Sequence, residues 1–273
     1  MQEEHKMSEK KVILDSHPTT THAYGFSLDA IDSFTNSGTP HRKLTENGNM
    51  DAFLDFTVQA LQKHHADPQK LQRIRKTIQS LGVDARESQQ SPYPQADKTR
   101  KGNFAEVVLA EYIKACTTAQ LPVYRLRYNP NVEQAMKGDD VLMFDLDSDP
   151  VRIIVGESKF RGTPSEQAVT DILDGLKKSH NAGLPISLAF VVDRLFESGQ
   201  NDLAEKLNGF TSMYLENKLT IDYIGLLLSN RNASNHVNKH TTGELHNLLM
   251  ISLSVNSPET LVSTAFDKLE AAL

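Results

Sequence analysis

The most informative part of the sequence runs from residue 136 to 160, MKGDDVLMFDLDSDPVRIIVGESKF. Its middle, residues 147–150 (DSDP), consists of residue types that favour turns. Apolar residues recur on both sides of this turn with the alternation of strands. The pattern predicts a hairpin in which a strand over 140–146 pairs with a strand over 151–159.

Each strand of this hairpin carries charged residues at one end of a face that is otherwise apolar and predicted to be buried. Side chains alternate between the two faces of a strand, so Glu157 and Lys159 point to the same side as the apolar Val155. On the first strand, Asp140 shares a face with Leu142. The sequence therefore predicts two carboxylates and one ammonium group at the open end of the hairpin.

A further carboxylate is predicted in the helix that precedes the hairpin. Successive helical residues advance by about 100°, which places Glu106 among the apolar Leu109 and Ile113. A carboxylate in such a sector needs a partner, and a metal ion or a catalytic cation would supply one. After the hairpin, Gln167 stands in the first turn of the next predicted helix, where its amide can reach the same site.

This set of residues suits the hydrolysis of a phosphodiester. Carboxylates, a backbone carbonyl and water provide the hard oxygen ligands that Mg²⁺ or Mn²⁺ prefers. A bound metal ion activates water and stabilises charge on the phosphate. The compact positive charge of Lys159 can orient the attacking water or neutralise the developing oxyanion.

In their order along the chain, these residues resemble the PD-(D/E)XK nuclease superfamily. Glu106 lies in a leading helix, Gly138-x-Asp140 opens one strand, Glu157-Ser158-Lys159 closes the next, and Gln167 follows in a helix. Gly-Asp-Asp replaces the usual Pro-Asp, which leaves open whether Asp139 or Asp140 is the ligand. We favour Asp140 because it faces the same way as the apolar residues of its strand. From about residue 100 to the C-terminus, the chain resembles the anti-phage HamA/AbpA family within that superfamily.

The resemblance implies a metal-dependent DNA nuclease subunit of a bacterial anti-phage defence system. In that case Glu106, Asp140 and Glu157 would bind Mg²⁺ or Mn²⁺, Lys159 would assist the attacking water, and Gln167 would support the site. The family also implies a superfamily 2 helicase as partner, with the nuclease held inactive until the helicase meets phage or damaged DNA. Two alternatives are a non-catalytic subunit that binds DNA or regulates the helicase, and a structural adaptor in which these residues form a buried ion network.

The rest of the chain predicts an α/β fold. Helices are expected over 102–118, 165–181, 201–217 and 258–273, and further strands over 123–128, 186–193, 219–228 and 248–255. The expected architecture is a PD-(D/E)XK restriction-endonuclease-like core, with a mixed central sheet flanked by helices, over 98–273. Residues 1–90 are expected to form a separate, mainly helical N-terminal region. It is irregular over 15–49 apart from one strand or turn near 24–31, has helices from Met50 and Pro68, and is joined to the core by a linker over 87–97.

Composition excludes several classes of protein. The 273 residues are 38% hydrophobic and 23% charged, which is ordinary for a globular protein. No segment has the apolar length of a secretory signal or a membrane span, and the single cysteine, Cys116, is expected to be a buried thiol. These observations predict a cytoplasmic protein with no membrane partner. Isolated glycines, without a glycine-rich phosphate loop, argue against an ATPase.

The net charge of the chain disfavours tight binding of nucleic acid by the chain alone. A net charge of -6 argues that a partner delivers the DNA, because tight binding to the duplex needs an excess of cations. Residues 63–76 carry five Lys and Arg against one Asp, and either DNA or a partner protein could bind there. Residues 98–127 carry six Lys and Arg against two Glu and are the better candidate for phosphate contacts. The adjacent His64 and His65 are predicted to be surface residues.

Overall fold

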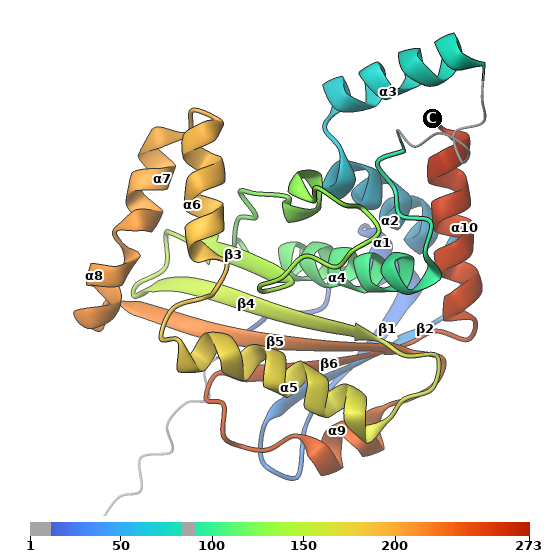
Figure 1. The fold of residues 1–273 in the computed structure, drawn as a ribbon. Helices are drawn as coiled ribbons and strands as arrows, with labels where there is room; N and C mark the ends of the chain where they lie inside the picture. Colours follow the sequence, from blue (N-terminus) through green and yellow to red (C-terminus); the bar gives the residue numbers. More distant parts are fainter. Residues whose placement is uncertain (1–11, 83–90) are drawn as a thin grey trace, which may run out of the picture.

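A six-stranded mixed sheet forms the centre of the protein, with helices on both faces (Figure 1). The structure is a computed structural model, and it describes residues 12–82 and 91–273. The strand order is β1-β2-β6-β5-β4-β3. The strands are β1 (Leu28–Phe34), β2 (Pro40–Glu46), β3 (Val141–Asp145), β4 (Val151–Phe160), β5 (Leu219–Ser229) and β6 (Leu248–Ser254).

The predicted hairpin is confirmed as β3 and β4, at one edge of the sheet. The two strands are antiparallel, and Val141 lies opposite Gly156. Strand β4 pairs in parallel with β5, β5 with β6, and β6 with β2. Strand β1 then pairs antiparallel with β2 and forms the other edge. The expectation of an α/β fold with a mixed central sheet flanked by helices is therefore confirmed.

Side-chain caps mark the start of two of the longer helices, α3 and α5. Asp67 accepts a hydrogen bond from the backbone N–H of Lys70 at 2.8 Å, and Ser165 accepts one from Ala168 at 3.3 Å. The helices are α1 (Ala23–Ser27), α2 (Met50–His65), α3 (Pro68–Leu81), α4 (Asp97–Ala115), α5 (Glu166–Asn181), α6 (Leu188–Glu197), α7 (Asn201–Asn208), α8 (Phe210–Leu215), α9 (Ser234–His240) and α10 (Pro258–Ala271). A short 3-10 helix, η1, spans Arg125–Tyr128.

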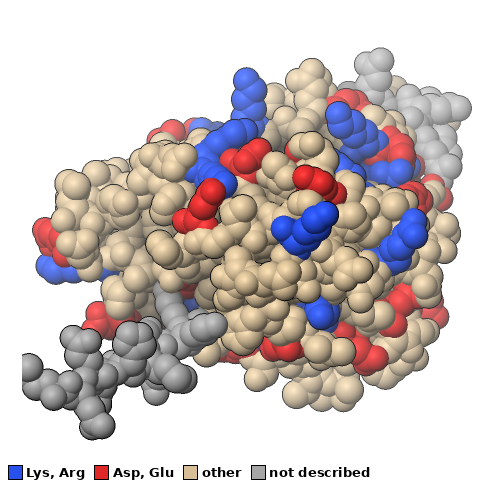
Figure 2. Space-filling view, turned by 90° about the horizontal axis from the view of Figure 1, so that it is seen from below, with Lys and Arg blue, Asp and Glu red and all other residues tan. Residues whose placement is uncertain are grey.

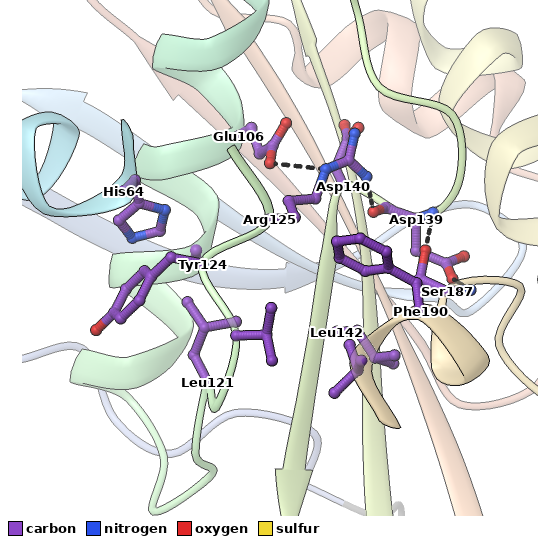
Figure 3. Close-up of a pocket in the computed structure, with 13 residues that line it drawn as sticks. His64, Glu106, Leu121, Tyr124, Arg125, Asp139, Asp140, Leu142, Ser187 and Phe190 are labelled. Carbon is purple, nitrogen blue, oxygen red and sulfur yellow. Dashed lines mark hydrogen bonds and ion pairs between the residues drawn. The ribbon is translucent and has the colours of Figure 1, made fainter. Parts of the chain in front are cut away.

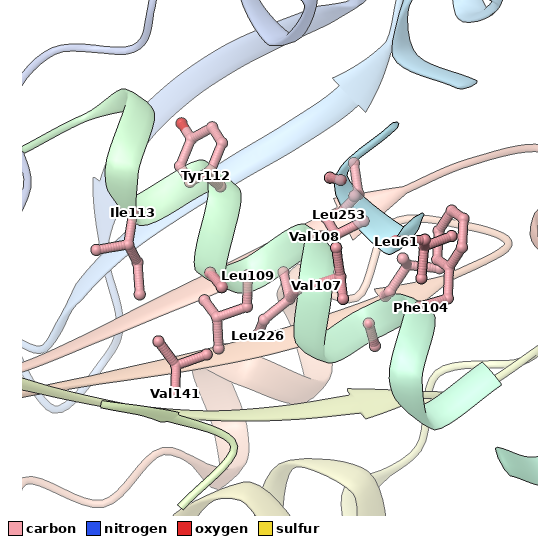
Figure 4. Packing of buried hydrophobic residues seen from close by; sticks show 14 of the residues in the cluster. Leu61, Phe104, Val107, Val108, Leu109, Tyr112, Ile113, Val141, Leu226 and Leu253 are labelled. Atoms are coloured by element: carbon pink, nitrogen blue, oxygen red, sulfur yellow. The ribbon is translucent and has the colours of Figure 1, made fainter. Parts of the chain in front are cut away.

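Two hydrophobic clusters hold these layers together, one on each face of the sheet. Helix α4 is buried from Asn103 to Ile113, and its apolar side chains pack against strand residues such as Val141 and Leu226 (Figure 4). On the other face, α5 contributes Ile172 and Leu176 to a second cluster. Burying each such side chain stabilises the fold by about 1.5–3 kcal/mol. The hairpin is thereby clamped between α4 and α5.

Two of the predicted strands are helices. Residues 186–193 contribute to α6, because Leu188, Val191 and Leu195 are buried at the spacing of one helix face. Residues 123–128 contain η1, in which Leu126 is buried and the arginines on either side of it are partly buried. The single predicted helix over 201–217 is divided into α7 and α8.

The N-terminal region is more ordered than the sequence indicated. Residues 15–49 were expected to be irregular apart from one strand or turn near 24–31, where α1 ends and β1 begins. They contain α1, β1 and β2, and β2 pairs with β6 of the central sheet. Helix α2 packs on α4 and α10. The part of the predicted linker that falls within 83–90 lies outside the described residues, and the proposed domain boundary stays a prediction.

The structure shows whether three residues with predicted exposure, His64, His65 and Cys116, are buried. His64 and His65 are buried, with 3% and 2% of their surfaces exposed, so the prediction of surface residues was wrong. His64 shares a hydrogen bond of 2.9 Å with the buried Glu111, and Asn103 lies 3.0 Å from the ring of His65. Cys116 is buried as expected.

The surface combines both signs of charge. On the face seen from below in Figure 2, acidic and basic side chains are interspersed over a largely uncharged surface. Basic side chains gather only locally among the described residues, at particular pockets.

None of the helices that the structure describes has the length and apolar character of a transmembrane segment.

Candidate functional site

The hairpin opens into a fork at the end where the predicted site lies. Pairing of β3 with β4 begins at Val141 opposite Gly156, whereas β4 continues to Phe160. A cleft of about 470 Å³ occupies this fork. Its lining includes Glu106 from α4, Arg125 from η1, Asp140 before β3, and Ser158 and Lys159 from β4.

Asp140 bridges the two arms of the fork. Its Oδ2 accepts hydrogen bonds from the backbone N–H and the hydroxyl of Ser158, both at 2.9 Å. The carboxylate of Asp139 is instead buried and accepts hydrogen bonds from the hydroxyl of Ser179 and, at 2.9 Å, from the backbone N–H of Ser187. Asp139 therefore ties the strand to α5 and to the start of α6, and the geometry favours Asp140 as the ligand.

Gly138 makes this arrangement possible. Its φ is +109°, a conformation that side chains disfavour. A Cβ at Gly138 would also lie 2.5 Å from Oγ of Ser187, the hydroxyl that accepts a hydrogen bond from the backbone N–H of Asp139 at 2.8 Å. The glycine in Gly-Asp-Asp thus sets the direction in which the chain enters β3.

Glu157 and Lys159 lie on the same face of β4, as predicted, and form an ion pair. The side chains keep 13% and 25% of their surfaces exposed. The carboxyl group of Glu157 lies against α5 at Gly175, where a Cβ would approach its Cδ to 2.6 Å. Gly175 is thus a site residue that the sequence reasoning missed, because its role depends on how α5 crosses β4.

Arg125 is the second residue that the sequence reasoning did not place. Its Nε lies 3.1 Å from Oε1 of the buried Glu106. The same guanidinium group donates to the backbone carbonyl of Asp139 and, at 2.9 Å, to that of Met136. Figure 3 shows the guanidinium between Glu106 and the segment that carries Asp139 and Asp140. The sequence marked Arg125 only as one of six cations over 98–127.

Burial and neighbouring charge raise the pKa of both glutamates at the fork, Glu106 in the cleft and Glu157 beside it. Burial raises the pKa of Glu106 to about 8, and the charges of Asp140 and Glu157 add to the rise against the opposing charge of Arg125. Burial and the charge of Asp140 likewise raise the pKa of Glu157 to about 7, against the attraction of Lys159. Mutual repulsion of this kind favours a bound cation.

The donor chemistry of the cleft fits a divalent cation. Glu106, Asp140 and Glu157 supply carboxylate oxygens, which Mg²⁺ and Mn²⁺ prefer. Within residues 12–82 and 91–273, however, no three Asp, Glu, His or Cys side chains are grouped closely enough to hold a metal ion as they stand. Binding by all three carboxylates would therefore require side chains to move, and Arg125 is the cation already paired with one of them.

Gln167 is not brought into this group. Its side chain is exposed and donates a hydrogen bond of 2.8 Å to Oδ1 of Asp171, which in turn pairs with Arg161 at 2.9 Å. The structure gives Gln167 no hydrogen bond to Glu157 or Lys159. Its supporting role stays a prediction.

The basic residues of 98–127 serve different purposes. Lys98, Lys101 and Arg125 line the cleft, and Lys101 lies 5.5 Å from the ring centre of Phe160. Arg100 instead pairs with Glu270 at 2.7 Å, and Lys114 pairs with Glu111. Together with Lys159 and Arg161, these cations line the same cleft as Glu106 and Asp140, which suits a phosphate-containing ligand.

Sequence comparisons link the chain to a known family. The HamA family model matches residues 9–269, a range that contains every residue of the cleft. The Hachiman protein HamA of Bacillus cereus is 35% identical over 237 residues. The match covers 85% of this chain and 85% of that protein.

Proposed function

This chain belongs to the HamA family and is an anti-phage defence protein, and we propose that it acts there as a metal-dependent DNA nuclease. One observation carries the proposal: Glu106, Asp140, Glu157 and Lys159, predicted from three separate segments, converge at the fork of β3 and β4. An adaptor would not need to bury Glu106 and Glu157 next to Asp140, where burial and the neighbouring negative charge raise the pKa of both glutamates.

Each residue has a distinct part in the proposed reaction. Glu106, Asp140 and Glu157 would hold Mg²⁺ or Mn²⁺, which supplies an activated water and stabilises charge on the phosphate when bound. Lys159, fixed by its ion pair with Glu157, orients the water or offsets the developing negative charge. Ser158 holds Asp140 across the fork.

The order of elements supports assignment to the PD-(D/E)XK type. Helix α4, the hairpin β3-β4, helix α5 and the parallel strand β5 follow in sequence, and the candidate residues stand on the first three of these. Gln167 would have to leave Asp171 before its amide could support the site. The proposal therefore rests on the other four residues.

A partner that brings DNA to the cleft completes the proposal. The net charge of -6 and the local character of the basic residues favour delivery of DNA by another subunit. A superfamily 2 helicase of the same defence system is the proposed partner. The chain resembles a Hachiman protein HamA, and that name implies a defence system with partner proteins.

One observation favours a second candidate function. Arg125 already pairs with Glu106, and no ready-made group of three ligands is found in the part of the chain that the structure describes. These facts suit a non-catalytic subunit that binds DNA or regulates the helicase. This candidate requires neither Mg²⁺ nor Lys159.

A cleavage experiment separates the two. The chain, with its partner, is incubated with plasmid DNA and Mg²⁺, and the double variant Glu157→Ala, Lys159→Ala is compared with wild type. The matched control removes an exposed pair of the same charges, Glu205→Ala, Lys206→Ala. We expect EDTA and the site variant to lower the rate by roughly 1,000-fold, with no effect of the control. Unchanged cleavage by the site variant would overturn the assignment.

A further inference from the structure

A second basic pocket lies away from the carboxylates, between α2, α3 and η1. It has a volume of about 230 Å³, and three cations and two amides contribute to its lining: Lys63, Arg75, Arg127, Gln59 and Gln62. None of the described residues that line it is acidic. It includes part of the basic stretch 63–76, to which the proposed nuclease reaction gives no role.

The cations of this pocket are held in place. Arg127 donates through Nε to the carbonyl of Lys63 at 2.8 Å, and Arg75 donates through Nε to the carbonyl of Ala272 at 3.0 Å. The guanidinium of Arg127 and the ammonium of Lys63 lie 4.6 and 5.0 Å from the ring centre of Tyr124. The protein thus fixes two positive charges beside one ring, and a third lines the same pocket.

An anion would relieve the repulsion between these charges. Asp67 lies beside the pocket. Its Oδ1 accepts a hydrogen bond from the backbone N–H of Lys70 at the start of α3, and its charge offsets part of the charge of Arg127. Guanidinium groups bind phosphate through parallel N–H donors, and amides and lysine add single contacts. A volume of 230 Å³ admits a phosphate group with part of its sugar.

The position of the pocket relative to the cleft indicates which phosphate binds. Helix η1 spans only Arg125–Tyr128, and its two arginines serve different cavities: Arg125 lines the carboxylate cleft and Arg127 lines the basic pocket. A nucleic acid strand that leaves the cleft past Arg125 therefore reaches Arg127 by crossing one short helix.

We propose that this basic pocket binds a backbone phosphate of the nucleic acid strand held in the cleft, outside the cleaved bond. The inference rests on the proposed nuclease function and extends it. Its consequence is a substrate requirement, because a strand has to span both cavities to be held well. A small phosphodiester that occupies only the cleft gains nothing from the pocket.

Charge reversal at Lys63 tests the proposal, because this side chain is exposed and its loss leaves the core intact. A fluorescein-labelled 40-nucleotide strand and its duplex are titrated with wild type and Lys63→Glu at several salt concentrations. The control is Lys76→Glu, an exposed lysine of α3 that does not line the pocket. We expect Lys63→Glu to weaken binding roughly tenfold and to reduce the salt slope by about 1, and the control to change binding less than about twofold.

Two further readouts separate the possible outcomes. Cleavage of bis(p-nitrophenyl) phosphate should be the same for wild type and Lys63→Glu, because this small ester reaches only the cleft. If no variant cleaves any ester while Lys63→Glu still weakens DNA binding, the nuclease proposal fails and the phosphate site stands. Equal DNA binding by Lys63→Glu and Lys76→Glu would overturn the inference. Loss of co-purification with the partner subunit at unchanged DNA binding would also overturn it, in favour of a protein-docking site.

Discussion

Gly175 is the position where one methyl group should disturb the site and leave the fold intact. In Gly175→Ala, the new Cβ would lie 2.6 Å from Cδ of Glu157 and 2.9 Å from its Cγ and Oε1. Carbon atoms in ordinary contact are about 3.5 Å apart. The carboxyl group of Glu157 therefore has to move by about 1 Å.

This displacement should affect activity far more than stability. The group that moves is the end of a flexible side chain, so the strain amounts to about 1 kcal/mol. Alanine is a better helix former than glycine by about 1 kcal/mol, which offsets this strain. A misplacement of about 1 Å at a reacting group lowers a rate by about 100-fold. We expect Gly175→Ala to lose about 100-fold in DNA cleavage at an almost unchanged free energy of unfolding.

The assay combines the rate of plasmid cleavage in Mg²⁺ with unfolding by urea. Gly209→Ala is the matched control, because a Cβ there meets only backbone oxygens, at 3.4 Å and beyond. Cleavage by Gly175→Ala at the wild-type rate would refute the reasoning, since Glu157 would then act equally well from another position.

Three further predictions concern stability. Burial alone would raise the pKa of Glu111, but hydrogen bonds from His64 and Lys114 overcome this effect and lower the pKa from 4.5 to about 2. The shift stabilises the fold by roughly 3 kcal/mol above pH 4.5, and this stabilisation is lost as the pH falls toward 2. Glu111→Gln should therefore lower the free energy of urea unfolding by about 3 kcal/mol at pH 7 and by much less at pH 3; an equal loss at both would contradict this. Gly225→Ala places a Cβ 2.5 Å from a buried side chain of α5 and should cost about 1–3 kcal/mol, whereas an unchanged melting temperature would show that the core adapts. Leu109→Ala should cost about 2–5 kcal/mol in the same urea assay, because Leu109 is fully buried in α4, and a loss below about 1 kcal/mol would argue against that packing.

The hairpin could be predicted from sequence because local signals agree there. Turn-forming residues separate two apolar strands, and the alternation of side chains placed Glu157 and Lys159 on one face correctly. The same reasoning failed for residues 186–193, where a short apolar run is compatible with a strand or a buried helix. It also missed β2 and most of β1, since many of their side chains are polar or exposed and the pairing of β2 with β6 is a long-range contact that no local pattern records.

Some residues of the candidate site could likewise be predicted from the sequence, and others could not. Glu106, Asp140, Glu157 and Lys159 could be named because strand and helix periodicity fixes their faces. Arg125 and Gly175 could not, because one reaches Glu106 from a 3-10 helix and the other makes room for Glu157 where α5 crosses β4. Both roles exist only after tertiary packing.

If the carboxylates of the fork hold a divalent cation, calorimetric titration with Mn²⁺ should detect it. We expect one Mn²⁺ to bind to wild type, alone or with DNA, and binding to be lost in Asp140→Asn. The exposed Asp147→Asn should bind like wild type. Absence of Mn²⁺ binding by wild type with and without DNA, or equal binding by Asp140→Asn, would contradict the account.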